Sequence, residues 1–297
     1  MKMQLLNLID SDKSDIKWRV SRYPDGQVHL ELLDDIDRKH DLRIMCRIRN
    51  SDELFLLAQL GNILEQIQVI PEILDIKYLL AARTDRVFEL GRQALDLKIV
   101  ANIVNSLNAE HVRITDVHSN SATKIIKNSF SWEYDWWTNT NPSILSTNSI
   151  ILFPDEGAEM RSSDRLYNNE SGMLTELNKL VGVDKIFHCK KQRLNDGSVG
   201  SVVIEGLTPE YYDYYSSKDF YVVDDLSDGG GTFLKLASEL KSNGIKMKSL
   251  NLIVTHMIQE QGLLKLSSVY DHVYTTNSYE DRSTSNYNNV TIINLLE

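Results

Sequence analysis

The stretch from Phe220 to Lys241, FYVVDDLSDGGGTFLKLASELK, constrains the fold more than any other part of the chain. It begins with four apolar residues of aromatic and β-branched types, which is typical of a buried strand. An acidic, glycine-rich turn follows, and from Phe233 to Leu240 apolar residues recur at positions i, i+3, i+4 and i+7, as on one face of a helix. The stretch therefore predicts a strand, a glycine loop and a helix in succession.

The glycine loop has the composition of a phosphate site. Glycines allow backbone N–H groups to point at a common centre, and the N-terminus of a helix adds a partial positive charge. The carboxylates of Asp224 and Asp225, at the end of the strand, are good acceptors for sugar hydroxyls, so the two features together indicate a ribose 5-phosphate unit. The residues expected to hold the phosphate are Asp228, Gly229, Gly230, Gly231 and Thr232. The alternative is a strand-to-helix turn with solvated acids, and the loop has neither the Walker pattern nor GxGxxG spacing.

Length and composition limit what the chain can do. Its 297 residues leave room for two ordinary domains, and a net charge of −10 disfavours nucleic acid as a partner. The two cysteines, Cys46 and Cys189, lie far apart, which favours a reducing compartment and disfavours a metal–thiolate site. The first residues hold too short an apolar run for a secretion signal, and no uncharged apolar stretch is long enough to cross a membrane. We therefore expect a cytoplasmic protein that binds neither membrane nor nucleic acid.

The sequence VVDDLSDGGGT resembles the ribose-phosphate loop of type I phosphoribosyltransferases and of phosphoribosyl pyrophosphate synthetases. The loop alone does not separate the two families. Further segments between Tyr23 and His256 resemble motifs of the synthetases and occur in the same order as in that family. The simple transferases lack the first of these motifs, so the order favours the synthetases.

Three segments of the first half resemble the parts of the synthetases that bind ATP. Tyr23-Pro24-Asp25-Gly26-Gln27 resembles a Phe-x-Asp-Gly-Glu element that binds the adenine of ATP held by a neighbouring subunit, with Gln27 in place of Glu. Ala82 to Arg86 resembles an Ala-Arg-Gln-Asp-Arg motif, and Asp116 to His118 resembles an Asp-Leu-His motif that contacts the metal–ATP complex. The ATP-binding residues implied by this resemblance are Tyr23, Asp25, Gln27, Arg83, Thr84, Asp85 and His118. From the residues alone, the same segments also fit a plain hairpin, a surface salt-bridge turn and a solvated histidine.

Two segments of the second half resemble catalytic motifs of the synthetases. Asp155 follows a buried strand, in a segment similar to Pro-Asp-x-Gly-Gly-x-x-Arg, and a carboxylate there suits Mg²⁺. The resemblance implies that His118 contacts the metal as well. Lys191 and Arg193 match a Lys-x-Arg pair on a catalytic loop. In an extended segment these two side chains point the same way and could close over phosphates during transfer. The alternative for the pair is a solvated basic hairpin.

Both halves of the chain have strands whose carboxyl ends carry the polar residues, as in open α/β sheets that bind ligands. With the resemblance, this predicts two tandem phosphoribosyltransferase-like α/β domains, each a mainly parallel sheet flanked by helices. We place the ATP-side domain at residues 1–142 and the domain with the ribose-phosphate loop at residues 143–297. The boundary lies in an aromatic and then Asn/Ser/Thr-rich segment, 130–148.

The resemblance implies a diphosphokinase that transfers the β,γ-diphosphate of ATP to the anomeric hydroxyl of ribose 5-phosphate, with Mg²⁺, and releases AMP. Gly229 stands where the synthetases carry Thr, so we hypothesise that the site admits a larger acceptor such as ADP-ribose, whose pyrophosphate product could feed NAD synthesis. The family usually forms dimers that build hexamers, so a homo-oligomer is expected. Two alternatives remain open: a phosphoribosyltransferase, and a non-catalytic relative of the synthetases that acts as a binding or regulatory subunit.

Overall fold

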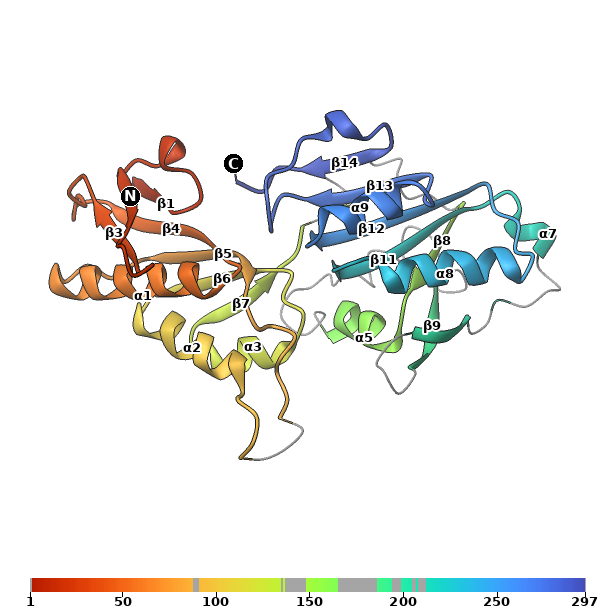
Figure 1. Ribbon diagram of the computed structural model, residues 1–297, viewed down its shortest axis with the longest axis horizontal. Coiled ribbons are helices and arrows are strands. Elements are labelled where there is room, and N and C mark those ends of the chain that lie inside the picture. The colour runs from red at the N-terminus through yellow and green to blue at the C-terminus, as the bar shows by residue number, and fades with distance from the viewer. Residues whose placement is uncertain are drawn as a thin grey trace. The chain divides into compact units, whose positions relative to one another are not determined.

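The computed structural model describes residues 2–87, 91–134, 136, 148–164, 186–193, 199–204, 207 and 212–296, without the side chains of 161–164, 191–193, 199–203 and 212. The chain divides into two compact units, Met1–Tyr134 and Asp135–Glu297 (Figure 1). The domain boundary expected at 142/143 falls on residues outside the described part, and it stays a prediction.

The first unit is built on a five-stranded parallel sheet in the order β1-β4-β5-β6-β7. The strands are β1 (Met3–Asn7), β4 (Asp41–Ile48), β5 (Ile73–Leu79), β6 (His111–Thr115) and β7 (Ser129–Trp132). The helices α1 (Ser51–Gln66), α2 (Asp96–Ser106) and α3 (Asn120–Ile125) connect β4 to β5, β5 to β6 and β6 to β7. Each helix joins a strand to the next strand on the same side of it. Crossovers of this kind are right-handed, so the three helices cover one face of the sheet. A short 3-10 helix, η1 (Ser11–Lys13), follows β1.

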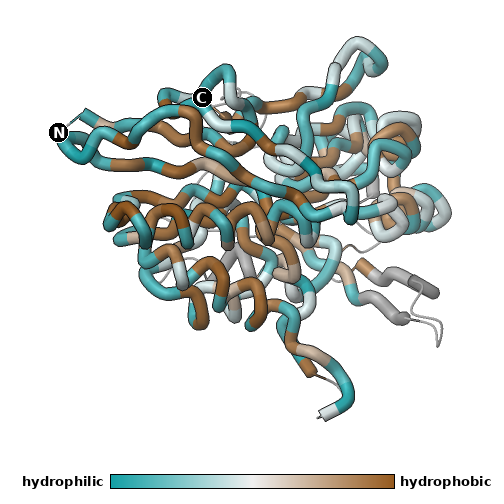
Figure 2. Tube along the Cα trace, turned by 60° about the vertical axis from the view of Figure 1, so that its left-hand side comes forward, coloured by the Kyte–Doolittle hydropathy of each residue, from teal (hydrophilic) through white to brown (hydrophobic). Residues whose placement is uncertain are grey.

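Helix α1 shows why the sequence adopts this arrangement. Asn50 caps the N-terminus of this helix, because its side-chain Oδ1 accepts a hydrogen bond from the backbone N of Glu53 at 3.0 Å. Its leucines at 54, 57, 60 and 64 are buried, and Figure 2 shows the alternation of hydrophobic and hydrophilic residues along the helices. The helical period of apolar residues between 51 and 67 in the sequence predicts this helix, and the structure confirms it.

An antiparallel hairpin of β2 (Trp18–Arg22) and β3 (Val28–Leu32) packs beside α1 in the first unit. Its turn contains Gly26 at φ +94°, a conformation that glycine adopts without strain. The Gln59 side chain of α1 pairs with the backbone of β3: its Nε2 donates to the carbonyl of Val28 at 3.0 Å, and its Oε1 accepts from the N–H of Leu30 at 2.9 Å. The hairpin is therefore held on α1 by both ends of one amide, as well as by packing.

The second unit is built on a seven-stranded sheet in the order β10-β9-β8-β11-β12-β13-β14, in which β9 and β10 are antiparallel and the other neighbours are parallel. The strands are β8 (Ser149–Phe153), β9 (Ile186–Arg193), β10 (Val199–Ile204), β11 (Asp219–Ser227), β12 (Ser249–Met257), β13 (His272–Thr276) and β14 (Val290–Ile293). The helices are α5 (Glu156–Asp164), α7 (Tyr212–Tyr215), α8 (Gly231–Ser242), α9 (Glu260–Ser267) and the 3-10 helix η5 (Thr284–Asn286). The predicted fold class, α/β with mainly parallel sheets flanked by helices, is confirmed.

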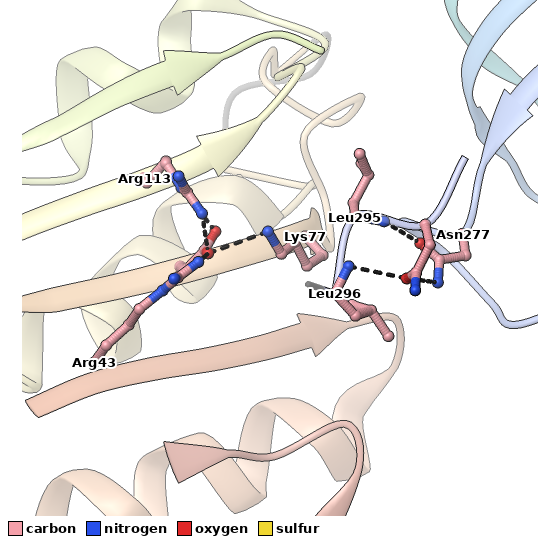
Figure 3. A network of polar contacts seen from close by, with 8 residues as sticks. Arg43, Lys77, Arg113, Asn277, Leu295 and Leu296 are labelled. Atoms are coloured by element: carbon pink, nitrogen blue, oxygen red, sulfur yellow. Dashed lines mark hydrogen bonds and ion pairs between the residues drawn. The ribbon is translucent and has the colours of Figure 1, made fainter. Parts of the chain in front are cut away.

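A buried charge cluster lies in the sheet of the first unit. The Asp75 carboxylate, with 0% of its side chain exposed, accepts hydrogen bonds from Arg43 at 2.5 Å and from Arg113, and the Nζ of Lys77 lies 3.1 Å away (Figure 3). The guanidinium of Arg113 also lies over the ring of Trp132. Burial by itself would raise the pKa of Asp75, but the hydrogen bond from Arg113 and the charge of Lys77 outweigh it and hold the pKa below its ordinary value. One buried carboxylate therefore pairs with three cations, of which only Lys77 is fully buried.

Within the part of the chain that the structure describes, no helix is both long enough and apolar enough to span a bilayer.

Candidate active site

The strand order of the second unit reverses between β8 and β11. From β8 the chain continues to its neighbour β9 on one side, and from β11 it continues through β12 and β13 to β14 on the other. The two central strands are parallel and in register, with Leu152 beside Val222. Ligands of open α/β sheets bind at such a switch point, outside the carboxyl ends of the strands. The loop that follows β8 here contains Asp155. The loop that follows β11 consists of Asp228–Thr232, and we call it the acceptor loop.

Strand β11 runs to Ser227, four residues beyond the predicted end of the strand. Asp224 and Asp225 therefore belong to the strand, and consecutive strand residues point to opposite faces of a sheet. Asp225 is 4% exposed and Asp224 is half-buried. The backbone N of Asp225 also donates to Oδ1 of Asp224 at 3.0 Å. The two carboxylates were expected to act together on ribose hydroxyls. In the strand they point to opposite faces of the sheet, so their surroundings differ.

The acceptor loop turns directly into α8. Gly230 caps the helix at φ +80°, in the left-handed region that favours glycine, and a Cβ there would lie 3.1 Å from Leu266. Gly231 is the first helical residue, and no atom lies within 4 Å of the position its Cβ would take. The first N–H groups of a helix have no partner within it, and together with the helix dipole they form a position suited to an anion.

The loop between β12 and α9 supports the acceptor loop from the side. The backbone N of Ile258 donates to the carbonyl of Ser227 at 2.8 Å, and Nε2 of Gln259 donates to Oδ1 of Asp228 at 2.8 Å. A Cβ on Gly262 would lie only 2.6 Å from the carbonyl oxygen of Asp228, so the backbones pack without room for a side chain. Gln259 and Gly262 were not predicted from the sequence, because their role arises only where the loops after neighbouring strands meet.

The same β12 segment carries His256, which is buried and shares a 2.8 Å contact between its Nδ1 and the Oγ of Ser278. Arg282 donates to the carbonyls of Met257 and Ile258 at 2.6 and 2.7 Å. These contacts fix the end of β12 against the following loop and so fix the support of the acceptor loop.

Asp155 lies where β8 ends and α5 begins. Its Oδ1 accepts a hydrogen bond from the backbone N of Ala158 at 2.8 Å, which caps the helix. Among the described residues, no three His, Cys, Asp or Glu side chains are close enough to hold a metal ion together. Mg²⁺ commonly binds one or two carboxylates and takes its other ligands from water and substrate phosphates, so the donor chemistry of Asp155 fits this ion. His118 belongs to the other unit, and a metal contact shared with Asp155 stays a prediction.

The predicted catalytic pair lies on an arm of the second unit. Strand β9 pairs with β8 as far as His188, beside Phe153, and from Cys189 to Arg193 it pairs with β10. The backbone of Lys191 and Arg193 thus continues past the carboxyl end of β8, toward the edge at which Asp155 lies. The side chains of the pair lie outside the described part, and their catalytic role stays a prediction.

In the first unit, the structure brings two of the predicted ATP motifs together. Asp85, after β5, accepts hydrogen bonds from the hydroxyls of Ser119 at 2.6 Å and Ser121 at 3.1 Å, which follow β6 and His118. Burial opposes ionisation of Asp85, but these hydrogen bonds outweigh it and lower its pKa. Thr84 donates its hydroxyl to the carbonyl of Ala81 at 3.0 Å, which closes the turn, and Arg83 is exposed beside it.

The third ATP motif forms the tip of the β2–β3 hairpin. Tyr23 is 49% exposed, and its ring centroid lies 5.6 Å from that of His29. Oδ1 of Asp25 accepts from the N–H of Gln27 at 3.0 Å, so the aspartate stabilises the turn itself. An exposed ring at a hairpin tip offers a stacking surface, as the prediction of an adenine contact requires.

Comparisons with known proteins agree with the motifs. No family model matches the chain. A ribose-phosphate pyrophosphokinase of Ralstonia nicotianae is 26% identical over 237 residues, which cover 76% of this chain and 66% of that protein. A ribose-phosphate pyrophosphokinase of Helicobacter hepaticus is 28% identical over 276 residues, which cover 88% of this chain and 79% of that protein.

A solved structure shows the same fold over nearly the whole chain. The phosphoribosylpyrophosphate synthetase from Mycobacterium smegmatis matches with a TM-score of 0.75 at 13% sequence identity, covering 99% of this chain and 95% of that one. The predicted resemblance to phosphoribosyl pyrophosphate synthetases is therefore confirmed, in sequence by the curated relatives and in fold by this structure.

Proposed function

We propose that this chain, a relative of the ribose-phosphate pyrophosphokinases, is itself an ATP-dependent diphosphokinase. It transfers the β,γ-diphosphate of ATP to the anomeric hydroxyl of a ribose 5-phosphate unit and releases AMP. The observation that carries the proposal is the position of the acceptor loop and the Asp155 loop on either side of the switch point between β8 and β11. One loop has the backbone geometry for a phosphate, and the other supplies a carboxylate for the metal that accompanies ATP.

In this proposal the residues of the second unit divide the work on the acceptor. The acceptor loop and the start of α8 bind the 5-phosphate through backbone N–H groups, and Asp224 and Asp225 accept hydrogen bonds from ribose hydroxyls. Lys191 and Arg193 neutralise charge on the diphosphate as it moves. Transfer of this kind needs little covalent help from the protein, so positioning and electrostatic stabilisation account for catalysis.

The first unit would bind ATP. Tyr23, with Asp25 and Gln27, would contact the adenine from a neighbouring copy, while Arg83 to Asp85 and His118 would contact the phosphates. An adenine site shared between copies requires at least a dimer, and mass measurement by light scattering tests this. Magnesium, held at Asp155 and contacted by His118, would neutralise the polyphosphate.

The identity of the acceptor is the finer part of the proposal. Ribose 5-phosphate is the acceptor implied by the names of the relatives. ADP-ribose is the second candidate, because Gly229 brings no side chain to the loop, and the nearest atom to a Cβ built there is Oε1 of Gln259 at 3.7 Å. Its product, ADP-ribose pyrophosphate, would connect the enzyme to NAD metabolism.

The experiment is AMP release from ATP and Mg²⁺ in parallel tubes with ribose 5-phosphate and with ADP-ribose. AMP with ribose 5-phosphate alone identifies an ordinary synthetase, and AMP mainly with ADP-ribose identifies a changed acceptor. AMP formed without any base excludes a phosphoribosyltransferase, which would consume a pyrophosphorylated ribose instead. Folded protein that forms AMP in neither tube would refute the proposal and favour a non-catalytic relative of the synthetases.

A variant at Lys191 tests whether the AMP is formed by this protein or by a contaminating enzyme. Lys191→Ala should lower AMP release on the order of 100-fold or more, because it removes a charge that stabilises the phosphates in transfer. The matched control is Lys241→Ala, which removes an exposed lysine at the far end of α8 and should leave the rate unchanged. Equal rates in both variants would show that Lys191 has no part in the reaction.

A further inference from the structure

We propose that Gln259 is a positioning residue of the acceptor loop and that it determines which 5-substituents the loop admits. The inference deepens the proposed function and rests on it, because it concerns the same loop. Gln259 precedes α9, in the segment after β12, and was not singled out by any motif in the sequence. The structure assigns it a place through three contacts between this segment and the loop after β11.

The contacts form a short ladder between two neighbouring loops. Strands β11 and β12 pair in register to their ends, with Ser227 beside Met257. One residue beyond Met257, the N–H of Ile258 donates to the carbonyl of Ser227 at 2.8 Å. The next contact is the 2.8 Å hydrogen bond from Gln259 Nε2 to Asp228 Oδ1. Gly262 then packs against the Asp228 carbonyl. The hydrogen bond between the side chains of Gln259 and Asp228 is thus the contact of the ladder that a substitution can remove without altering the backbone.

The charge of Asp228 gives this hydrogen bond its significance. A carboxylate beside a phosphate repels it, and at a few ångströms the repulsion is substantial in a partly buried site. Asp228 is half-buried at the start of the acceptor loop. The amide of Gln259 donates to this carboxylate at 2.8 Å and so ties it to the segment that precedes α9. Loss of the amide would remove one contact that fixes the carboxylate, and with it part of the control over the distance between this charge and the phosphate.

The carbonyl end of the same amide borders the space that Gly229 leaves open. The nearest atom to a Cβ built on Gly229 is Oε1 of Gln259, at 3.7 Å, an ordinary contact distance. A ribose 5-phosphate ends at its phosphate, whereas ADP-ribose continues from it with a second phosphate and adenosine. Beside Gly229, Gln259 therefore limits where such a continuation can leave the loop. We infer that Gly229 and Gln259 act as one specificity element.

The test is a set of single variants of the full chain, assayed for binding and for turnover. Titration calorimetry with ribose 5-phosphate, without ATP, measures acceptor affinity directly. Gln259→Ala should weaken that affinity about tenfold, the loss expected for one hydrogen bond to a charged group. Gln259→Glu should weaken it further, because it sets a second carboxylate against Asp228. In turnover, the KM for ribose 5-phosphate should rise while kcat and the KM for ATP stay near wild type, and Gln259→Ala should raise the relative kcat/KM for ADP-ribose.

Gln261 provides the matched control. It is an exposed glutamine two residues further on, in the first turn of α9. Gln261→Ala and Gln261→Glu make the same chemical changes at that exposed position and should leave acceptor affinity and substrate preference unchanged. The inference is overturned if wild type binds ribose 5-phosphate and the Gln259 variants bind it equally well, or if the Gln261 variants lose affinity to the same extent. Wild type that binds no ribose 5-phosphate would instead refute the proposed function, and the inference with it.

Discussion

Replacing Gly262 with alanine places one methyl group against the backbone of the acceptor loop. The Cβ would lie 2.6 Å from the carbonyl oxygen of Asp228 and 3.1 Å from the carbonyl carbon of Gly229. Both neighbours are backbone atoms, so no side chain can rotate away. To restore an ordinary contact of 3.4 Å, the carbonyl oxygen must move by about 0.8 Å. That displacement falls on the peptide that precedes the phosphate-binding glycines.

The expected effect on stability is small, and the expected effect on binding is large. Overpacking of this kind costs about 1–3 kcal/mol, whereas alanine in place of glycine within a helix contributes about 1 kcal/mol of stability. The net loss in the free energy of unfolding is therefore about 0–2 kcal/mol. A shift of about 1 Å at a positioning group, in contrast, can reduce the rate about 100-fold.

The assay compares Gly262→Ala with wild type in AMP release and in calorimetric titration with ribose 5-phosphate, alongside a thermal melt. The control for a general effect of alanine in this turn is Gln261→Ala, because Gln261 directly precedes Gly262 and is exposed. We expect a folded protein with a large loss of acceptor affinity and turnover. A Gly262→Ala variant with wild-type affinity for ribose 5-phosphate would refute the argument that the α9 backbone fixes the loop.

Two further substitutions test the structure at other points. Asp75→Asn leaves the buried Lys77 and two partly exposed arginines without their carboxylate. We expect it to lower the free energy of unfolding by about 3–5 kcal/mol in denaturant titrations, and a stability equal to that of wild type would contradict this role of Asp75. Because the pKa of Asp75 is lowered in the folded state, its stabilisation is present above its ordinary pKa of 3.8 and is lost as the pH falls through the folded value. Stability measured from pH 5 downward should therefore fall more steeply in wild type than in Asp75→Asn. Gly230→Ala forces an L-residue into φ +80° beside Leu266, and we expect about 1–2 kcal/mol of destabilisation with weaker phosphate binding, whereas an unchanged melt would show that the turn can relax.

The elements of the fold followed from local patterns in the sequence. The helical spacing at 233–240 predicted α8, because a period of 3.6 residues is visible in a short window. The cluster around Asp75 was not predicted. Its strand alternates polar and apolar residues, a pattern that ordinarily indicates a half-exposed strand, and only the meeting of Asp75, Lys77 and Arg113 in three dimensions makes burial of charge possible.

The candidate site was predictable where one loop carries its own chemistry. Three glycines and an acid between a strand and a helix indicate a phosphate position without reference to the rest of the chain. The end of the strand was placed too early, because two aspartates are unfavourable in most strands and β11 accommodates them at its carboxyl end. The contact between Asp85 and Ser119 was also not predicted, because it joins loops that are 34 residues apart.

The pairing of Gly229 with Gln259 changes how the substitution in the acceptor loop should be interpreted. From the loop alone, loss of a threonine side chain suggests a wider site. In the structure, the space beside Gly229 is bordered by an amide from the next loop, which is itself held by Asp228. A wider site therefore requires that Gln259 move or be removed, so the preference for ADP-ribose depends on the pair and not on the glycine. If ADP-ribose is the better acceptor in wild type, Gln259 must rotate on binding, and Gln259→Ala would then raise the kcat/KM for ADP-ribose relative to that for ribose 5-phosphate.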